Sequence, residues 1–273
     1  RISKGYLSNV CKQCEIEQKI IRELSIKLNI IDNYYDGKCS RCCVSSTFLP
    51  VLEFHHPDPT IKESSWRKLK GRELLKILKT LQKEKVIILC RNCHTLLRAK
   101  FFLKYKDIIL LENIFKQSIE LLDHNLMRFI KNQPDIHEKI RKNRNYITQT
   151  KYMIKNNWLK KRYIIEELFD GKCVGCRSVN VEKNLPSLNF HHLDPSKKDI
   201  IVKWQEINHL DLKEIFKLMR KEECVCLCAN CHIIIDSNRF LKNIDKILNS
   251  KKAVLFKKEI NKIFKNIEMY KDK

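Results

Sequence analysis

Cysteine and histidine residues form one ordered pattern that occurs twice in this 273-residue chain. The first copy reads CSRC, FHHPDP and LCRNCH between Cys39 and His94, and the second reads CVGC, FHHLDP and LCANCH between Cys173 and His232. Each copy contains two CxxC pairs, a histidine pair between them and one more histidine directly after the last cysteine. This order predicts a metal site beside a catalytic site in each copy.

The two CxxC pairs of each copy predict a zinc site. Zn²⁺ takes about four ligands in a tetrahedron, and one CxxC turn presents two thiolates to the ion. Because four thiolates leave no open position, we expect two structural zinc ions as cofactors. The predicted ligands are Cys39, Cys42, Cys90 and Cys93 in the first copy, and Cys173, Cys176, Cys228 and Cys231 in the second.

Five of the thirteen cysteines lie outside these two sets. Cys43 adjoins Cys42 and could replace it as a ligand, whereas we expect Cys224 and Cys226 to be small buried hydrophobic residues. Cys11 and Cys14 are half of a tetrahedral site, which a further CxxC pair in a segment before Arg1 would complete. The alternatives are two ordinary thiols or ligands that join another site.

The histidine pair of each copy follows a short apolar stretch that predicts a strand. Adjacent strand residues point to opposite faces, so that His55 and His56 cannot perform the same task. If one of them binds a metal ion, the other can take a proton. Core packing or alternative zinc ligation would also use histidines, but six of the nine histidines fall at matching places in the two copies, which favours chemistry.

Helical segments repeat around the metal motifs, and the offset between matching residues stays between 134 and 138 positions. Residues 15–29 have apolar side chains at helical spacing, and a DGK turn with Gly37 or Gly171 precedes the first CxxC pair of each copy. An amphipathic helix is predicted after each histidine pair, and in the second copy Asp211 and Glu214 form a capping-box pattern at its start. The unit of duplication is therefore a whole domain.

The expected fold class is mainly α with short β-hairpins (α+β), arranged as two tandem zinc-stapled modules with flanking helices. Only five glycines and six prolines support a helical rather than a loop-rich chain. The predicted organisation is a partial zinc-knuckle segment, a first module, a basic helical linker, a second module and a C-terminal helical tail. Their bounds are 1–24, 25–120, 121–158, 159–258 and 259–273.

The formal charge of the chain is +23. Binding two zinc ions through eight thiolates would change it by about −4, so that the protein stays strongly basic. A charge of this sign and size attracts a polyanion, and we expect DNA as the partner, with RNA not excluded. The alternative is a lysine-rich protein whose basic side chains only face water.

One basic segment, residues 139–162, contains nine Lys or Arg residues, no acidic residue and three interleaved aromatic residues. Basic residues with aromatics suit a surface that follows a nucleic-acid backbone and stacks on bases. A solvated connecting helix is the alternative interpretation. The residues predicted to contact nucleic acid here are Arg141, Lys142, Arg144, Lys160, Lys161 and Arg162.

Paired CxxC spacing with adjacent histidines favours metal ligation over disulfides, and therefore a reducing intracellular compartment, the cytoplasm or the nucleoid or nucleus. The sequence has no apolar run of about 18 residues or more, and we expect no membrane partner.

CxxC, FHHxDP and LCxNCH in this order resemble the HNH endonuclease family, whose ββα-metal fold surrounds one divalent ion. The resemblance covers Gly37 to about Arg98 and Gly171 to about Asp236. It implies a metal-dependent endonuclease that hydrolyses phosphodiester bonds in DNA, with two modules forming a pseudo-dimer within one chain. A zinc-stabilised nucleic-acid-binding protein without turnover is the alternative.

The resemblance also implies a role for each histidine. His56 and His192 match the general base of the family. One divalent ion per active site, magnesium or manganese, is expected on a pair of histidines that comes from the strand and the helix. These pairs are His55 with His94 in the first copy and His191 with His232 in the second.

Some positions depart from the family pattern. Many relatives have a further His or Lys four residues after the CH dipeptide, where this chain has Arg98 and Asp236. Arg98 is expected to meet a phosphate, which Asp236 would repel. Lys85 and Glu223 stand near the place of the middle asparagine that names the motif. These departures weaken the expectation of activity more for the second copy than for the first.

Overall fold

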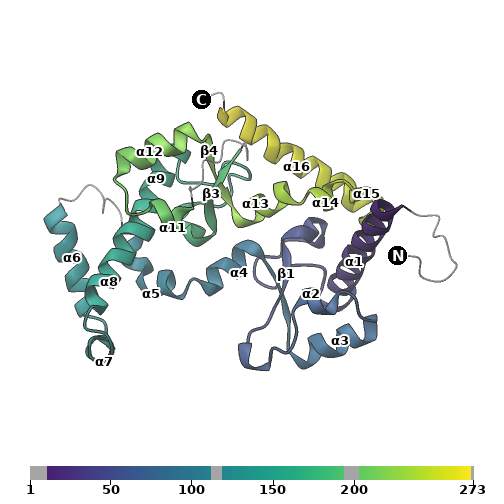
Figure 1. Cartoon of the computed structure of the whole chain (residues 1–273), viewed down its shortest axis with the longest axis horizontal. Coiled ribbons are helices and arrows are strands. Elements are labelled where there is room, and N and C mark those ends of the chain that lie inside the picture. The colour runs from purple at the N-terminus through teal and green to yellow at the C-terminus, as the bar shows by residue number, and fades with distance from the viewer. Residues whose placement is uncertain (1–10, 112–118, 194–202, 272–273) are drawn as a thin grey trace. The chain divides into compact units, whose positions relative to one another are not determined.

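A computed structural model of the chain describes residues 11–111, 119–193 and 203–271 (Figure 1). Over these residues the protein is mainly helical, with two small antiparallel sheets of two strands each. The chain forms two compact units, which comprise residues 1–94 with 233–261 and residues 95–232 with 262–273. The cysteine and histidine residues of the first copy lie in the first unit, and those of the second copy lie in the second unit.

The first unit contains the elements of the first copy and two short helices from the C-terminal part. They are α1 (Lys12–Tyr34), β1 (Leu52–His55), α2 (Trp66–Leu69), α3 (Leu74–Lys83), β2 (Ile87–Cys90), α4 (Arg91–Arg98), α14 (Asn238–Leu241) and α15 (Ile244–Ile247). Short 3₁₀ turns at Ser46–Val51 and Pro59–Ile61 flank β1. Helix α4 continues past the end of this unit.

The second unit begins with helices that connect the two copies and continues with the second copy. Its elements are α5 (Lys100–Ile109), α6 (Ile119–Lys131), α7 (Ile136–Lys142), α8 (Tyr146–Tyr152), α9 (Lys160–Phe169), α10 (Val181–Asn184), β3 (Leu188–His192), α11 (Trp204–Ile207), α12 (Leu212–Lys221), β4 (Cys224–Cys228) and the first turn of α13 (Ala229–Asp236). A π-helical stretch, Met153–Leu159, joins α8 to α9, and a 3₁₀ turn, Leu185–Ser187, precedes β3.

The last helix, α16 (Ser250–Lys271), confirms the helical tail that the apolar spacing after Lys252 predicts. The predicted domain boundaries remain predictions, although the one between residues 258 and 259 falls inside this continuous helix.

Each sheet pairs a strand that precedes two helices with a strand that follows them. Leu52 lies opposite Cys90 in the first sheet, and Leu188 lies opposite Cys228 in the second. The predicted β-hairpins are thus antiparallel strand pairs joined through α2 and α3, or α11 and α12, and not by a tight turn. Pairing places the histidine end of the first strand beside the start of the second strand, which ends at the third cysteine of each set.

The DGK turns reverse the chain after α1 and α9. Gly37 and Gly171 have φ values of 63° and 69°, in the left-handed region that glycine adopts without strain. Their N–H groups donate to the carbonyls of Ile31 and Ile165 at 2.9 and 3.0 Å, which closes the C-terminal end of each helix. The turn therefore sets the direction in which the chain enters the first CxxC pair.

Each copy has an equivalent hydrophobic core. Five buried residues form this cluster, and they come from the helix that precedes the copy, the two helices between the strands and the chain that enters the second strand. Matched by position, they are Ile30, Leu69, Ile77, Leu81 and Val86 in the first copy, and Ile164, Ile207, Ile215, Met219 and Cys224 in the second. This one-to-one match confirms that the repeat includes the helix that precedes each copy.

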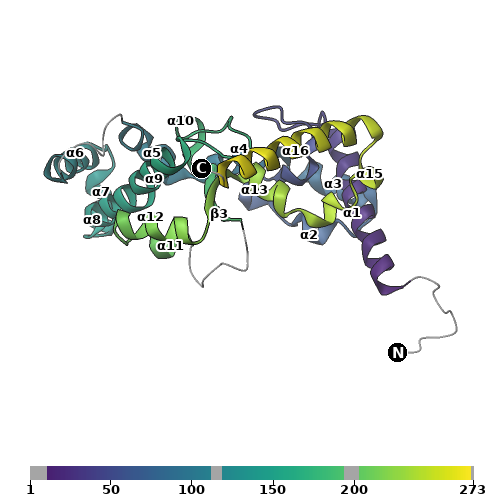
Figure 2. The ribbon, with the colours of Figure 1, turned by 90° about the horizontal axis from the view of Figure 1, so that it is seen from above.

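Helices from both ends of the sequence meet in the first unit. Helix α1 and helix α15 lie side by side in both views (Figures 1 and 2). Lys252, at the start of α16, donates hydrogen bonds to Asp32 Oδ2 at 2.5 Å and to Ser46 Oγ at 2.8 Å. None of the helices in the described part of the chain is long and apolar enough to span a membrane.

Candidate metal centres

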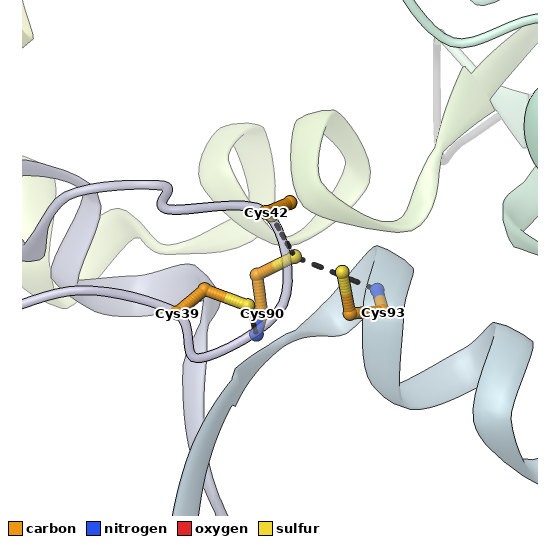
Figure 3. A group of neighbouring side chains, drawn as sticks. All are labelled: Cys39, Cys42, Cys90 and Cys93. Atoms are coloured by element: carbon orange, nitrogen blue, oxygen red, sulfur yellow. Dashed lines mark hydrogen bonds between the residues drawn. The ribbon is translucent and has the colours of Figure 1, made fainter.

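Both predicted cysteine sets come together as clusters that could hold a metal ion. In each set the four Sγ atoms lie within 4.8 Å of one another. Figure 3 shows how the first set converges: Cys39 and Cys42 lie on one loop, Cys90 ends β2, and Cys93 lies in the first turn of α4. A tetrahedron with Zn–S bonds of about 2.3 Å places sulfurs about 3.8 Å apart, so that these clusters fit structural zinc.

Backbone hydrogen bonds hold the knuckles in the same way in both copies. The N–H of Cys90 donates to Cys39 Sγ at 3.2 Å, and the N–H of Cys228 donates to Cys173 Sγ at 3.2 Å. The N–H of Cys93 also donates to Cys90 Sγ at 3.5 Å. N–H donors directed at sulfur stabilise thiolates, which are the form that binds a metal ion.

The neighbouring thiols also change the acidity of the cluster. Hydrogen bonds from Cys90 and Cys93 lower the pKa of Cys39. In the second copy Cys173, Cys228 and Cys231 lower the pKa of Cys176. At least one thiol of each cluster therefore has a lowered pKa, and the thiolate is the form that binds a metal cation.

The cysteines outside the clusters fall into two classes. Cys43 is exposed and has a φ of 60°, and its N–H donates to the carbonyl of Cys39 at 3.0 Å, so that it closes the knuckle turn while Cys42 joins the cluster. Cys224 and Cys226 are buried, as predicted. Within the described residues Cys11 and Cys14 pair only with each other among possible metal ligands, with Sγ atoms 3.0 Å apart.

Two histidine rings meet beside each four-cysteine cluster. The rings of His55 and His94 lie edge to face with centroids 4.9 Å apart. The rings of His191 and His232 have the same arrangement at 4.6 Å. Strand pairing places the first member of each pair, and the zinc knuckle leading into α4 or α13 places the second.

A carboxylate orients one of these rings in the first copy. His94 Nδ1 donates to Glu53 Oε2 at 2.7 Å, and Arg91 Nε lies 3.1 Å from Glu53 Oε1. Burial of Glu53 opposes ionisation, but the hydrogen bond from His94 and the charge of Arg91 outweigh it and lower the pKa of Glu53. Because this contact occupies Nδ1, a metal ion would bind His94 through Nε2.

The second copy has an amide where the first has this carboxylate. Asn189 occupies the place of Glu53 and donates to the carbonyl of Ser187 at 3.0 Å. Asp236, one helical turn after His232 on α13, takes the place of Arg98. The charges around the paired rings therefore differ between the copies. The sequence pattern predicted the difference between Arg98 and Asp236 but not the one between Glu53 and Asn189.

The second histidine of each motif contacts a buried glutamate that the sequence reasoning missed. His56 Nε2 donates to Glu84 Oε2, and His192 Nε2 donates to Glu222 Oε2 at 2.6 Å. The side chains of Glu84 and Glu222 are 0% and 3% exposed. These glutamates directly precede Lys85 and Glu223. Because an acidic residue recurs at this place with the same offset in both copies, the sequence contained a signal for them.

A third possible ligand group in the second copy consists of His192, Glu222 and Cys224. Burial, together with the charge of Glu222, raises the pKa of Cys224 to about 12. The thiol therefore stays protonated near neutral pH, which opposes metal binding because the thiolate is the ligand form. In the first copy Val86 occupies the place of Cys224 in the matching core cluster.

The basic residues that were predicted to contact nucleic acid divide into an exposed and an interior group. Arg98, Arg141, Lys142 and Arg144 are exposed. Lys161 is only 7% exposed and lies over the ring of Trp158 at 6.0 Å, so that its side chain belongs to the interior, and its contact with nucleic acid stays a prediction. Its burial lowers the pKa of Lys161 to about 8.

The two neighbours of Lys161, Lys160 and Arg162, also make hydrogen bonds within the second unit. Lys160 Nζ donates to the carbonyls of Asn208 and Leu210 at 2.8 and 2.7 Å. The side chain of Arg162 is 12% exposed and donates to Glu166 and to two backbone carbonyls of the chain near Ile109. Because the start of α9 has neighbours on more than one side, three consecutive side chains all find partners within the unit, which a count of charges along the sequence does not reveal.

Asp58 caps the turn after the first histidine pair, because it accepts hydrogen bonds from Thr60 N at 2.8 Å and Thr60 Oγ1 at 2.6 Å. Its counterpart in the second copy, Asp194, lies outside the described residues.

No protein-family model matches the chain, and no curated protein or solved structure shows significant similarity to it. Conclusions about its activity therefore depend on its own residues and their geometry.

Proposed function

We propose that the chain is a metal-dependent endonuclease that hydrolyses phosphodiester bonds in DNA with two HNH-like modules. The observation that carries the proposal is the duplicated histidine triplet beside each four-cysteine cluster. In each copy two rings face each other, and the third histidine contacts a buried glutamate instead. Such a division between metal ligands and a proton acceptor is what phosphodiester hydrolysis needs.

In the first module His55 and His94 would hold one divalent ion, magnesium or manganese, through imidazole nitrogens. When bound, this ion supplies Lewis-acid polarisation of the scissile phosphate and stabilises the leaving oxygen. His56 takes a proton from the attacking water and contributes about 10²- to 10⁴-fold to the rate. Glu53 fixes the ring of His94 through its Nδ1 proton.

In the second module His191 and His232 would hold the ion, and His192 takes the proton. Asp236 would add a third ligand from the same face of α13 as His232, four residues earlier. A carboxylate ligand favours magnesium or manganese more strongly than two imidazoles alone. Asp236 would repel a phosphate, but as a metal ligand its negative charge is favourable.

Cleavage of a supercoiled plasmid tests the proposal. The zinc-loaded chain with magnesium or manganese should convert the plasmid to linear product, because each module cuts one strand. His56→Ala and His192→Ala, introduced separately, should each leave nicked circles, and the double variant should leave the plasmid intact. A double variant that cleaves at the rate of the unchanged chain would refute the assignment of the base.

A second candidate function is a zinc-stabilised nucleic-acid-binding protein, which the net charge of +23 favours. A protein of this kind needs the cysteine clusters and the exposed basic residues but not His56 or His192. If the zinc-loaded chain binds duplex DNA in a salt-dependent manner and cleaves no phosphodiester with either metal ion, the binding function is the correct one.

A further inference from the structure

We propose that Glu84 and Glu222 are positioning residues that fix the ring proton of His56 and His192 on Nε2, so that Nδ1 carries the lone pair. The proposal deepens the proposed nuclease function and rests on it for its catalytic consequence. Its geometric part concerns only the histidine rings and is measurable without cleavage.

Glu84 is fully buried and accepts three hydrogen bonds, which determine how its carboxylate is oriented. Oε2 accepts from His56 Nε2, and Oε1 accepts from the backbone N–H groups of Glu63 and Ser64 at 3.2 and 3.0 Å. The side chain therefore links the base, the chain that follows the first histidine motif and the C-terminal end of α3. A carboxylate in this position can only accept, so that Nε2 must be the donor.

The arrangement recurs in the second copy. Glu222 ends α12 as Glu84 ends α3, and its side chain is 3% exposed while it accepts from His192 at 2.6 Å. A positive φ follows in both places, 48° at Lys85 and 47° at Glu223, and turns the chain into β2 or β4. Burying a carboxylate is unfavourable unless it is paired, and a purely structural role would be filled by an apolar residue at less expense. Its presence in both copies points to a task that needs a carboxylate.

The three hydrogen bonds of Glu84 make Glu84→Gln a sharp probe. Backbone N–H groups can only donate, so the glutamine carbonyl must keep facing Glu63 and Ser64, and its NH₂ group must face His56. The ring nitrogen Nε2 then has to accept, and the neutral imidazole carries its proton on Nδ1 instead. The opposite glutamine orientation would leave buried donors facing each other, at about 1–3 kcal/mol for each unsatisfied group. The substitution therefore inverts the tautomer while it preserves the shape of the site.

Long-range ¹H–¹⁵N nuclear magnetic resonance of the ¹⁵N-histidine-labelled, zinc-loaded full chain reads the tautomer directly. The His56 signals are identified by their loss in His56→Ala. We expect Nε2–H in the unchanged chain and Nδ1–H in Glu84→Gln. Glu73→Gln is the matched control, because Glu73 is an exposed glutamate at the other end of α3 and makes no capping hydrogen bond. An unchanged His56 tautomer in Glu84→Gln would overturn the proposal, whatever the cleavage result.

Kinetics in the His192→Ala background, where only the first module has its base, test the catalytic consequence. Glu84→Gln should lower kcat for nicking on the order of 10²-fold and leave KM for DNA and the zinc content unchanged. A tautomer that inverts without any loss of kcat would show that His56 is not the base. If the tautomer inverts but the unchanged chain cleaves no DNA, the positioning role stands and the nuclease function fails.

Discussion

At the scale of single residues, backbone conformation determines which cysteines join a metal cluster. Cys42 and Cys43 are adjacent and have the same chemistry, yet only Cys42 belongs to the metal cluster. Cys43 adopts a left-handed conformation with a φ of 60°, as Arg177 does with a φ of 55° at the matching place of the second copy. The turn needs this conformation at that position. The backbone of the CxxC turn therefore sets the direction of the Cys43 side chain, whatever the affinity of its thiol for zinc.

This difference predicts the zinc content of two variants. Cys42→Ser should lower bound zinc from two ions per chain to one, because three thiolates remain in the first cluster. Cys43→Ser should keep both ions. Zinc released by a thiol-blocking reagent, counted with a colorimetric chelator against protein concentration, measures the difference. Equal zinc content in the two variants would mean that Cys42 and Cys43 exchange as ligands.

At the scale of elements, the two amphipathic helices match in length and position but differ at their first turn. Asp211 caps α12 by accepting from Glu214 N at 2.8 Å, and Glu214 reaches back to Asp211 N at 3.4 Å. Glu73 stands at the same place before α3 and makes no side-chain capping bond. Tertiary packing through Ile77 and Leu81 therefore holds α3 without the local signal that α12 has.

Because α3 lacks the side-chain cap that α12 has, an alanine substitution at the N-cap should affect the stability of the two helices unequally. Asp211→Ala should destabilise the first turn of α12 by about 1 kcal/mol, because the backbone N–H of Glu214 loses its side-chain partner. Glu73→Ala should change α3 by less than about 0.5 kcal/mol. Amide hydrogen exchange followed by mass spectrometry should therefore be about fivefold faster in α12 of the first variant. Equal acceleration in both helices would show that the capping box contributes nothing.

At the scale of the whole molecule, the charge of +23 is distributed less simply than the sequence indicates. Arg141, Lys142 and Arg144 are exposed, whereas Lys161 is buried. The first copy contains a similar lysine at the matching position, Lys27, whose burial also lowers its pKa to about 8. Basic residues therefore serve both the surface and the packing of the repeated helix, and only the surface group can meet phosphates.

Salt dependence of DNA binding should distinguish these two groups. Replacing Arg141, Lys142 and Arg144 together by Ala should weaken binding and reduce the slope of log K against log salt by about 2 to 3, since each phosphate contact contributes about 0.9. Lys161→Met should leave the slope unchanged because this side chain does not face solvent. Fluorescence anisotropy with a labelled duplex measures both. An unaltered slope in the triple variant would place the DNA-binding surface elsewhere.

The sequence by itself determined the features that depend on local pattern. Ligand spacing predicted both four-cysteine clusters, a short apolar stretch predicted the strands that end in histidines, and helical periodicity predicted α1, α3, α12 and α16. The repeat could be read directly because a duplicated core keeps its apolar positions in register, as the matched clusters show. These features follow from residues that are close in the chain or from spacing that recurs.

Only the tertiary structure decided which polar side chains meet across long separations. Glu84 reaches His56 over 28 residues, and Glu53 reaches His94 over 41, because antiparallel pairing brings the ends of β1 and β2 together. Burial then turned Lys161 from an expected surface residue into an interior one. A sequence pattern records where a charged residue stands, but its partner and its exposure depend on the packing of several elements at once.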